Sequence, residues 1–231
     1  MKPSFAVLVL LLSLPVLAQT PSPANAEQAV VTFTFEWSQG IPWQSYSFQV
    51  EADGKAHFSG APNAAGGGDT DPVQQDFVMS EANRQEIFDT ARKLNYFRSD
   101  FDSHLKRIAQ TGTKTLAYKS DQVQGSSTYN YSQNPAVQRL TQLFLGIATT
   151  IDYDRKLAWQ YRFDKLGLNQ RLHELEELQA GHQVEELSIL DPILRKIAAD
   201  PNLMHISRQG AQQLLKAMGS QAATTQSAAQ P

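Results

Sequence analysis

Groups able to do acid–base chemistry gather at Asp100, Asp102 and His104. The three residues alternate along the chain, so in an extended segment all would point to the same side. An imidazole beside two carboxylates could act as a general base or contribute to a metal site. The same stretch also fits a polar connection that follows a helix, because no third group that would orient a catalytic base can be identified. We favour the polar connection and keep the cluster as the alternative.

Two other histidines stand four residues before a glutamate, as His173 with Glu177 and His182 with Glu186. On a helix, side chains at this spacing share a face, and each pair could offer two ligands to a metal ion. A zinc site needs at least three protein ligands, and residue 177 is not the second histidine of an H-E-x-x-H motif. We therefore predict ordinary exposed helix pairs, with no metal and no other cofactor.

Other catalytic signatures are missing from the sequence. The chain has no cysteine, which excludes thiolate catalysis, disulfide bonds and cysteine-ligated zinc. The glycines 66–68 lead to Asp69 and Asp71, but neither a calcium loop nor the lysine of a phosphate loop follows. No serine stands in a G-x-S-x-G turn. We therefore predict a non-catalytic domain that binds a protein or a cell-envelope component. The alternative is a hydrolase whose site is assembled from distant residues.

Aromatic residues are unusually dense near the N-terminus, at Phe33, Phe35, Trp37, Trp43, Tyr46, Phe48 and Phe58. Trp43 stands beside Pro42 in a short connection and could be exposed, and exposed aromatic side chains often contact protein or glycan partners. Trp43, with Trp37 and Tyr46, is therefore the candidate binding set. Burial in the core is the competing interpretation, and large aromatic side chains favour it.

Period-two alternation predicts strands in the first half of the chain. One strand covers residues 31–37 and a second covers 45–51, and Asp53-Gly54 makes a hairpin turn into a third. Weaker strand patterns follow at 75–79, 113–119 and 126–131.

Capping residues and apolar stripes predict the helices. One helix starts after Ser80, and another starts at Asn134-Pro135 and runs to Ile151. From Asp154 onward the pattern is entirely helical, and the last helix covers 207–218. Asp152 and Asp154 are expected to cap helices between these two parts.

This order predicts an α+β fold, an antiparallel sheet with helices on one face, followed by an all-helical C-terminal segment. We place the α+β domain at 30–152, the helical segment at 153–219 and a disordered tail at 220–231. The helical segment could also be a separable arm that contacts a partner, so that a chain cut near Asp154 would leave a folded first part.

Two stretches carry resemblances. Residues 53–60 read D-G-x-x-x-F-x-G, a helix with an isoleucine–phenylalanine pair spans Ser80 to Phe88, and a strand pair and a closing helix follow. Over about 120 residues this order resembles a family of uncharacterised bacterial exported proteins, known as a domain of unknown function. That resemblance implies the β-β-α-β-β-α order and no particular activity; many members carry a cysteine pair that is missing here. Residues 190–215 resemble a single HEAT-type helical hairpin, which cannot form a solenoid alone.

The N-terminus predicts export. A basic residue, an apolar run from Phe5 to Leu17 and a small-x-small site ending at Ala18 match a signal peptide of residues 1–18, followed by a flexible leader at 19–29. Ala24-Asn25-Ala26 offers a second cleavage site. Its apolar run is too short to span a membrane, and no later stretch is apolar enough, so we expect a bacterial periplasmic or secreted protein. Cleavage removes Lys2 from 20 basic residues, leaving 19 against 23 acidic ones, a net charge of −4. This charge argues against a nucleic-acid partner and against electrostatic docking on anionic lipid.

Overall fold

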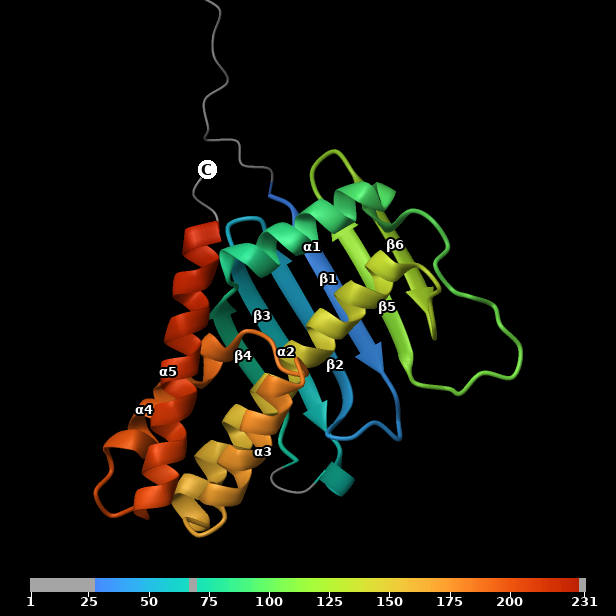
Figure 1. Cartoon of the computed structure of the whole chain (residues 1–231). Coiled ribbons are helices and arrows are strands. Elements are labelled where there is room, and N and C mark those ends of the chain that lie inside the picture. Colours follow the sequence, from blue (N-terminus) through green and yellow to red (C-terminus); the bar gives the residue numbers. More distant parts are fainter. Residues whose placement is uncertain (1–27, 67–69, 229–231) are drawn as a thin grey trace, which may run out of the picture.

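The strand patterns form one antiparallel sheet, in the order β4-β3-β2-β1-β5-β6 (Figure 1). The computed structural model describes residues 28–66 and 70–228, so the predicted signal peptide, most of the leader and part of the glycine-rich loop lie outside the described residues. The strands are β1 (Val30–Glu36), β2 (Trp43–Glu51), β3 (Lys55–Pro62), β4 (Val73–Val78), β5 (Thr113–Lys119) and β6 (Gln124–Tyr129).

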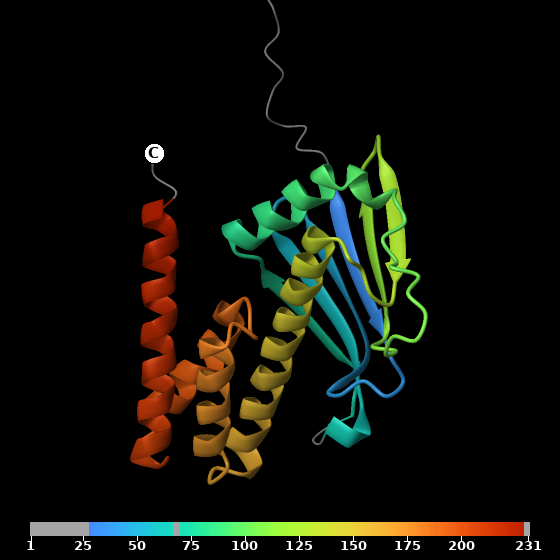
Figure 2. The ribbon, with the colours of Figure 1, turned by 45° about the vertical axis from the view of Figure 1, so that its right-hand side comes forward.

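The long helices lie on one face of this sheet and beside it (Figure 2). They are α1 (Glu81–Lys93), α2 (Pro135–Phe163), α3 (Leu168–Ala180), α4 (Asp191–Ala199) and α5 (His205–Ala228), with short 3-10 turns η1 (Ala64–Gly66), η2 (Asn95–Phe97) and η3 (Leu187–Leu190). The predicted α+β class with a helical C-terminal part is therefore confirmed.

Alternation along the strands builds the first hydrophobic core. Phe33 on the central strand β1 lies opposite Phe48 of β2 and Leu116 of β5, and all three side chains are fully buried. The Phe33 ring stacks on Phe144 of helix α2 at a centroid distance of 4.7 Å. The inward-facing side of the sheet is thus closed by α1 and the first half of α2, while the outward side keeps its polar residues in solvent.

Helix α2 is longer than the sequence pattern predicts. It continues past Ile151 to Phe163, because no glycine or proline lies between these two residues and the added turns keep presenting apolar positions to neighbouring helices. Asp152 and Asp154, expected to cap helices, lie inside α2 instead. The proposed boundary between 152 and 153 therefore falls in the middle of one helix, and a cut near Asp154 would sever it.

A second hydrophobic core lies in the helical layer. Leu157 of α2 is fully buried there with Leu168 and Leu175 of α3 and Leu194 of α4. Helix α5 closes this layer and continues through Gly219 to Ala228, so the tail expected to be disordered from residue 220 is helical as far as 228. A single glycine costs a helix only about 1 kcal/mol, and nearby residues such as Ala217, Gln221 and Ala222 are compatible with a helix.

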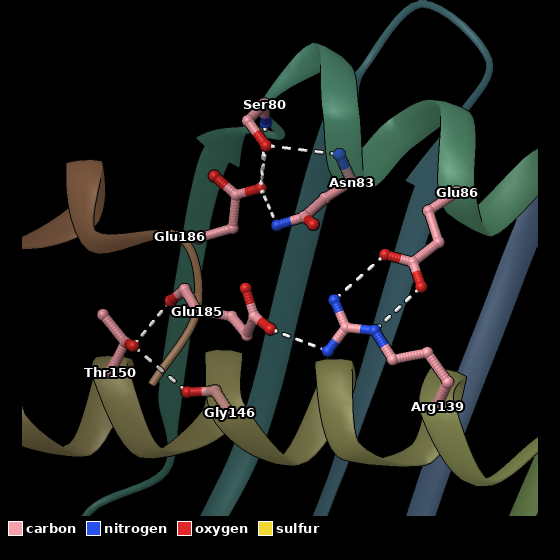
Figure 3. A network of polar contacts seen from close by, with 8 residues as sticks. All are labelled: Ser80, Asn83, Glu86, Arg139, Gly146, Thr150, Glu185 and Glu186. Atoms are coloured by element: carbon pink, nitrogen blue, oxygen red, sulfur yellow. Dashed lines mark hydrogen bonds and ion pairs between the residues drawn. The ribbon is translucent and has the colours of Figure 1, made fainter. Parts of the chain in front are cut away.

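The segment that leads from α3 to η3 joins the helical layer to the sheet domain (Figure 3). The Glu186 side chain is buried, and its Oε1 accepts hydrogen bonds from the Ser80 backbone N–H (3.0 Å), the Ser80 hydroxyl (2.6 Å) and the Asn83 amide (2.8 Å). A carboxylate at this position also complements the positive end of helix α1. Glu186 adopts left-handed backbone angles (φ 52°, ψ 48°), which cost a non-glycine residue about 1–2 kcal/mol. The three hydrogen bonds offset that cost.

The neighbouring residue fixes the same segment to helix α2. The hydroxyl of Thr150 lies 2.6 Å from the carbonyl oxygen of Glu185, and a Cβ at Gly146 would stand 2.8 Å from the Glu185 side chain, so the close approach requires glycine. The Glu185 carboxylate pairs with Arg139 at 2.9 Å, and Arg139 also makes a bidentate pair with Glu86 of α1 (Figure 3).

Glu186→Ala should lower the free energy of unfolding by about 2–4 kcal/mol, because it leaves the Ser80 and Asn83 donors without their buried acceptor. Urea unfolding followed by circular dichroism measures this. The control is Glu185→Ala, which removes a partly exposed ion pair and should cost no more than about 1 kcal/mol. Equal losses in the two variants would show that Glu186 does not hold the segment as described.

Candidate functional site

Asp100, Asp102 and His104 come together in the long loop between η2 and β5 (the loop at the right of Figure 1). His104 Nε2 lies 2.7 Å from the Asp100 carboxylate and Nδ1 lies 3.2 Å from Asp102. The alternating spacing would bring these side chains together in an extended segment, but here they meet through a turn, with His104 at a positive φ of 50°.

This cluster acts as a clip that holds the loop. Both imidazole nitrogens face carboxylates, so neither is directed at a substrate, and a general base needs a free one. The hydrogen bond to Asp100 raises the pKa of His104 above its ordinary value, which favours the charged imidazolium. Asp102 also accepts a hydrogen bond from the Asn130 backbone N–H at 3.0 Å. The geometry thus agrees better with the polar connection than with the acid–base cluster.

The predicted aromatic contact set lies mainly in the core. Trp43 is 3% exposed, its indole N–H donates to the carbonyl oxygen of Ala148 at 3.0 Å, and Arg155 stacks over its ring. Tyr46 is also buried, with a hydroxyl that has no hydrogen-bond partner within the described chain and a pKa raised by burial. Trp37 is partly buried at the edge of the same core. The core interpretation of Trp43 and Tyr46 therefore holds, because the chain turns Trp43 under helix α2.

A pocket of about 350 Å³ opens where β5 and β6 meet the first turns of α2. Its lining includes Thr111, Lys114, Tyr129, Tyr131, Gln138 and Gln142. Apart from Lys114 these are uncharged hydroxyl and amide side chains. A cleft of this size, with converging polar groups, is the kind of place where proteins bind small molecules.

Lys114 is the unusual member of this lining, since it is 6% exposed and lies on the core side of β5. Its ammonium group donates to the carbonyl oxygens of Thr111, Gly112 and Asn130 at 2.9–3.1 Å and lies 5.8 Å from the centre of the Phe35 ring. Burial lowers the pKa of Lys114 below its ordinary value. Sequence reasoning missed this residue, although its period-two phase with Leu116 and Tyr118 was the available signal.

The remaining candidate ligand pairs stay apart or exposed. His173 and Glu177 face each other across 3.4 Å on the exposed side of α3, as predicted for an ordinary helix pair. His182 and Glu186 do not share a helix, because α3 ends at Ala180. Within residues 28–66 and 70–228 no group of three or more histidine, aspartate or glutamate side chains is arranged to hold a metal ion. Over the same ranges, no helix combines the length and the apolar character that crossing a membrane would require.

Asp154 is a carboxyl group with no hydrogen-bond or ion-pair partner in the described part of the chain. It lies within helix α2, and burial raises its pKa from 3.8 to about 6. Its neighbour Asp152 is different, because Arg155 (3.0 Å) and Lys156 (2.7 Å) neutralise it. Asp154 is therefore a group whose ionisation near neutral pH works against folding.

Comparison with models of known protein families and with curated protein sequences finds no match to this chain. The two resemblances noted in the sequence therefore stay expectations.

The titration of His104 tests the clip. Its folded-state pKa lies above the ordinary value of about 6.5, so the clip contributes stability below pH 6.5 and loses it as the pH rises through that higher pKa. Nuclear magnetic resonance titration should show a raised pKa that falls toward the ordinary value in Asp100→Asn. Asp121→Asn, an exposed carboxylate elsewhere, should leave the titration unchanged. A wild-type pKa at or below 6.5 would contradict the arrangement.

Asp154→Asn should raise the free energy of unfolding by about 1–3 kcal/mol at pH 7–8, because it removes a half-buried charge. For a pKa raised from 3.8 to about 6, the penalty is complete above pH 6 and vanishes below pH 3.8. The gain should therefore shrink as the pH is lowered toward 4 in urea unfolding measurements. A gain of the same size at every pH would mean that the charge of Asp154 is not its cause.

Proposed function

We propose that this protein is an exported, non-catalytic binding domain that attaches to a lipid surface of the cell envelope through one end of its helical layer. The observation that carries this proposal is a group of large apolar side chains left in solvent at that end. Export itself rests on the predicted signal peptide of residues 1–18.

The exposed apolar group comes from three segments. Trp159 and Phe163 lie one turn apart near the end of α2 and are 44% and 67% exposed, and Leu166 in the following turn is 76% exposed. Met204 and Ile206, at the start of α5, are also exposed. We call these five residues the apolar tip. Single exposed apolar residues are common on protein surfaces, whereas a cluster of them marks an interaction surface.

The segments that carry the apolar tip lie together in space. In both Figure 1 and Figure 2, the end of α2, the α2–α3 turn and the first turn of α5 occupy the lowest part of the helical layer. The Tyr161 hydroxyl donates to Asp200 at 2.9 Å, which ties the end of α2 to the loop before α5. The apolar tip is thus built on fixed backbone.

Basic side chains accompany the apolar tip. Arg162 is exposed, lies over the ring of Phe163 at 5.6 Å, and forms no ion pair within the described chain. Lys165 is exposed in the same turn and reaches Asp200 only at 4.0 Å. Arginine and lysine beside tryptophan, phenylalanine and leucine are the composition that proteins use at the boundary between lipid headgroups and acyl chains. The whole chain has a net negative charge, but Arg162 and Lys165 place positive charge beside the apolar tip.

A lipid surface fits these observations better than a protein groove. The side chains project from the end of a helix and from turns, which suits insertion into a soft surface, and the cations beside them match headgroup phosphates. Neither imidazole nitrogen of the one acid–base cluster in the predicted set, at His104, is free, which favours binding over the hydrolase alternative.

Sedimentation with lipid vesicles tests the proposal. The mature protein should bind vesicles that contain phosphatidylglycerol more strongly than vesicles of phosphatidylcholine alone, with a blue shift of Trp159 fluorescence. Leu166→Ser should lower the partition coefficient about tenfold or more, since burying a leucine contributes about 1.5–3 kcal/mol. Its exposure predicts almost no change in stability.

The matched control is Val78→Ser, which removes a comparably exposed side chain (73%) from strand β4. This variant should bind vesicles like the wild type. Absence of vesicle binding by the wild type, or equal loss in the two variants, would refute the lipid surface. Saturable binding of a soluble protein that Leu166→Ser abolishes, without any vesicle binding, would replace it by a protein interface.

A further inference from the structure

The pocket lined by Lys114 holds a positive charge that no carboxylate of residues 28–66 and 70–228 balances. The groups around the ammonium are the carbonyl oxygens of Thr111, Gly112 and Asn130 and the Thr111 hydroxyl, all neutral. A buried cation is costly unless an anion accompanies it, and neutral acceptors repay only part of that cost. The electrostatic potential of the pocket therefore favours the binding of an anion.

One contact of the ammonium can be exchanged for a ligand oxygen at little cost. Lys114 has three N–H donors and four acceptors within 3.1 Å, so one acceptor is surplus. The Thr111 hydroxyl is the replaceable one, because it also lies 3.3 Å from the side-chain oxygen of Asn130 and can donate there. An incoming carboxylate oxygen would take its place on the ammonium.

The rest of the lining suits hydroxyl groups. Gln142 is exposed on α2 and its amide has no partner within the described chain, so it can both donate and accept. The Tyr131 ring is 43% exposed at the rim and offers an apolar face for a sugar ring. Amides and hydroxyls converge on a cavity of about 350 Å³, near the lower limit for ligand sites, so the occupant is small.

We propose that this pocket binds a small carboxylate that carries hydroxyl groups, of the size and chemistry of a single sugar acid. Lys114 balances the carboxylate, Gln142 meets the hydroxyl groups, and the ring of Tyr131 covers one side. The site lies at the β5–β6 end of the sheet, on segments other than those of the apolar tip, and does not depend on the proposed membrane attachment.

The probe is D-glucuronate, compared with D-glucose and with acetate, added to the mature protein. Binding is followed by chemical-shift changes of the backbone amides of Thr111, Asn130 and Tyr131 and by the rise in Tm that ligand binding produces. D-glucuronate should bind at least tenfold more tightly than D-glucose, which lacks the charge, and than acetate, which lacks the hydroxyl groups.

Variants separate recognition from folding. Lys114→Met should weaken D-glucuronate binding at least tenfold. Because Lys114 also holds buried carbonyl groups, the variant can fail to fold, so Gln142→Ala on the exposed side of α2 carries the test in that case. It should weaken binding about two- to tenfold, the loss expected for one hydrogen bond. The control Gln133→Ala removes an exposed glutamine outside the pocket and should change nothing.

Several outcomes would overturn the proposal. One is the absence of shift changes at millimolar D-glucuronate. Equal binding of D-glucose would show that Lys114 does not recognise the carboxylate. Equal binding of acetate would show that the pocket does not recognise the hydroxyl groups of the ligand. Binding that survives unchanged in Gln142→Ala and in a folded Lys114→Met would place the ligand elsewhere.

Discussion

The packing of helix α2 against two different partners is the contact on which the architecture depends. Its first half buries residues such as Phe144 and Ile147 against the sheet, and its second half buries Leu157 in the core of the helical layer. The helix is continuous from Pro135 to Phe163, so the position of one layer fixes the position of the other. A chain without cysteine forms no disulfide bonds, so its rigidity has to come from contacts of this kind.

Three charged side chains removed from solvent show how differently the fold treats a charge. Glu186 receives three hydrogen bonds at the start of α1, and the cost of its buried charge is met by donors. Lys114 receives neutral acceptors, which satisfy its hydrogens, and no carboxylate in the described part of the chain balances its charge. Asp154 has neither donors nor an opposite charge among the described residues, and its pKa rises. Glu186 holds the helical layer to α1, and Lys114 is the basis of the proposed ligand site. The ionised Asp154 lowers the free energy of unfolding, and nothing in the structure explains its presence.

The elements with local signals were predictable from the sequence. Period-two alternation located β1 and β2, the Asp53-Gly54 turn located β3, and Ser80 and Asn134 marked the starts of α1 and α2. Features that depend on distant contacts were not. The continuation of α2 past Ile151 needs α3 and α4 to cover it, and the burial of Trp43 needs the carbonyl group of Ala148, 105 residues away. The spacing of Asp100, Asp102 and His104 singled them out, but it assumed an extended segment and not the turn that brings them together. Lys114 was overlooked because lysine is expected outside.

Native-state hydrogen exchange along α2 tests the shared-helix account most directly. If α2 joins both cores into one cooperative unit, amides near Ile147 and amides near Leu157 should open with the same free energy, equal to that of global unfolding. Exchange near Leu157 at a clearly lower free energy, together with α3 and α4 and with the sheet still protected, would contradict the account. It would show instead that the helical layer is an arm that unfolds by itself.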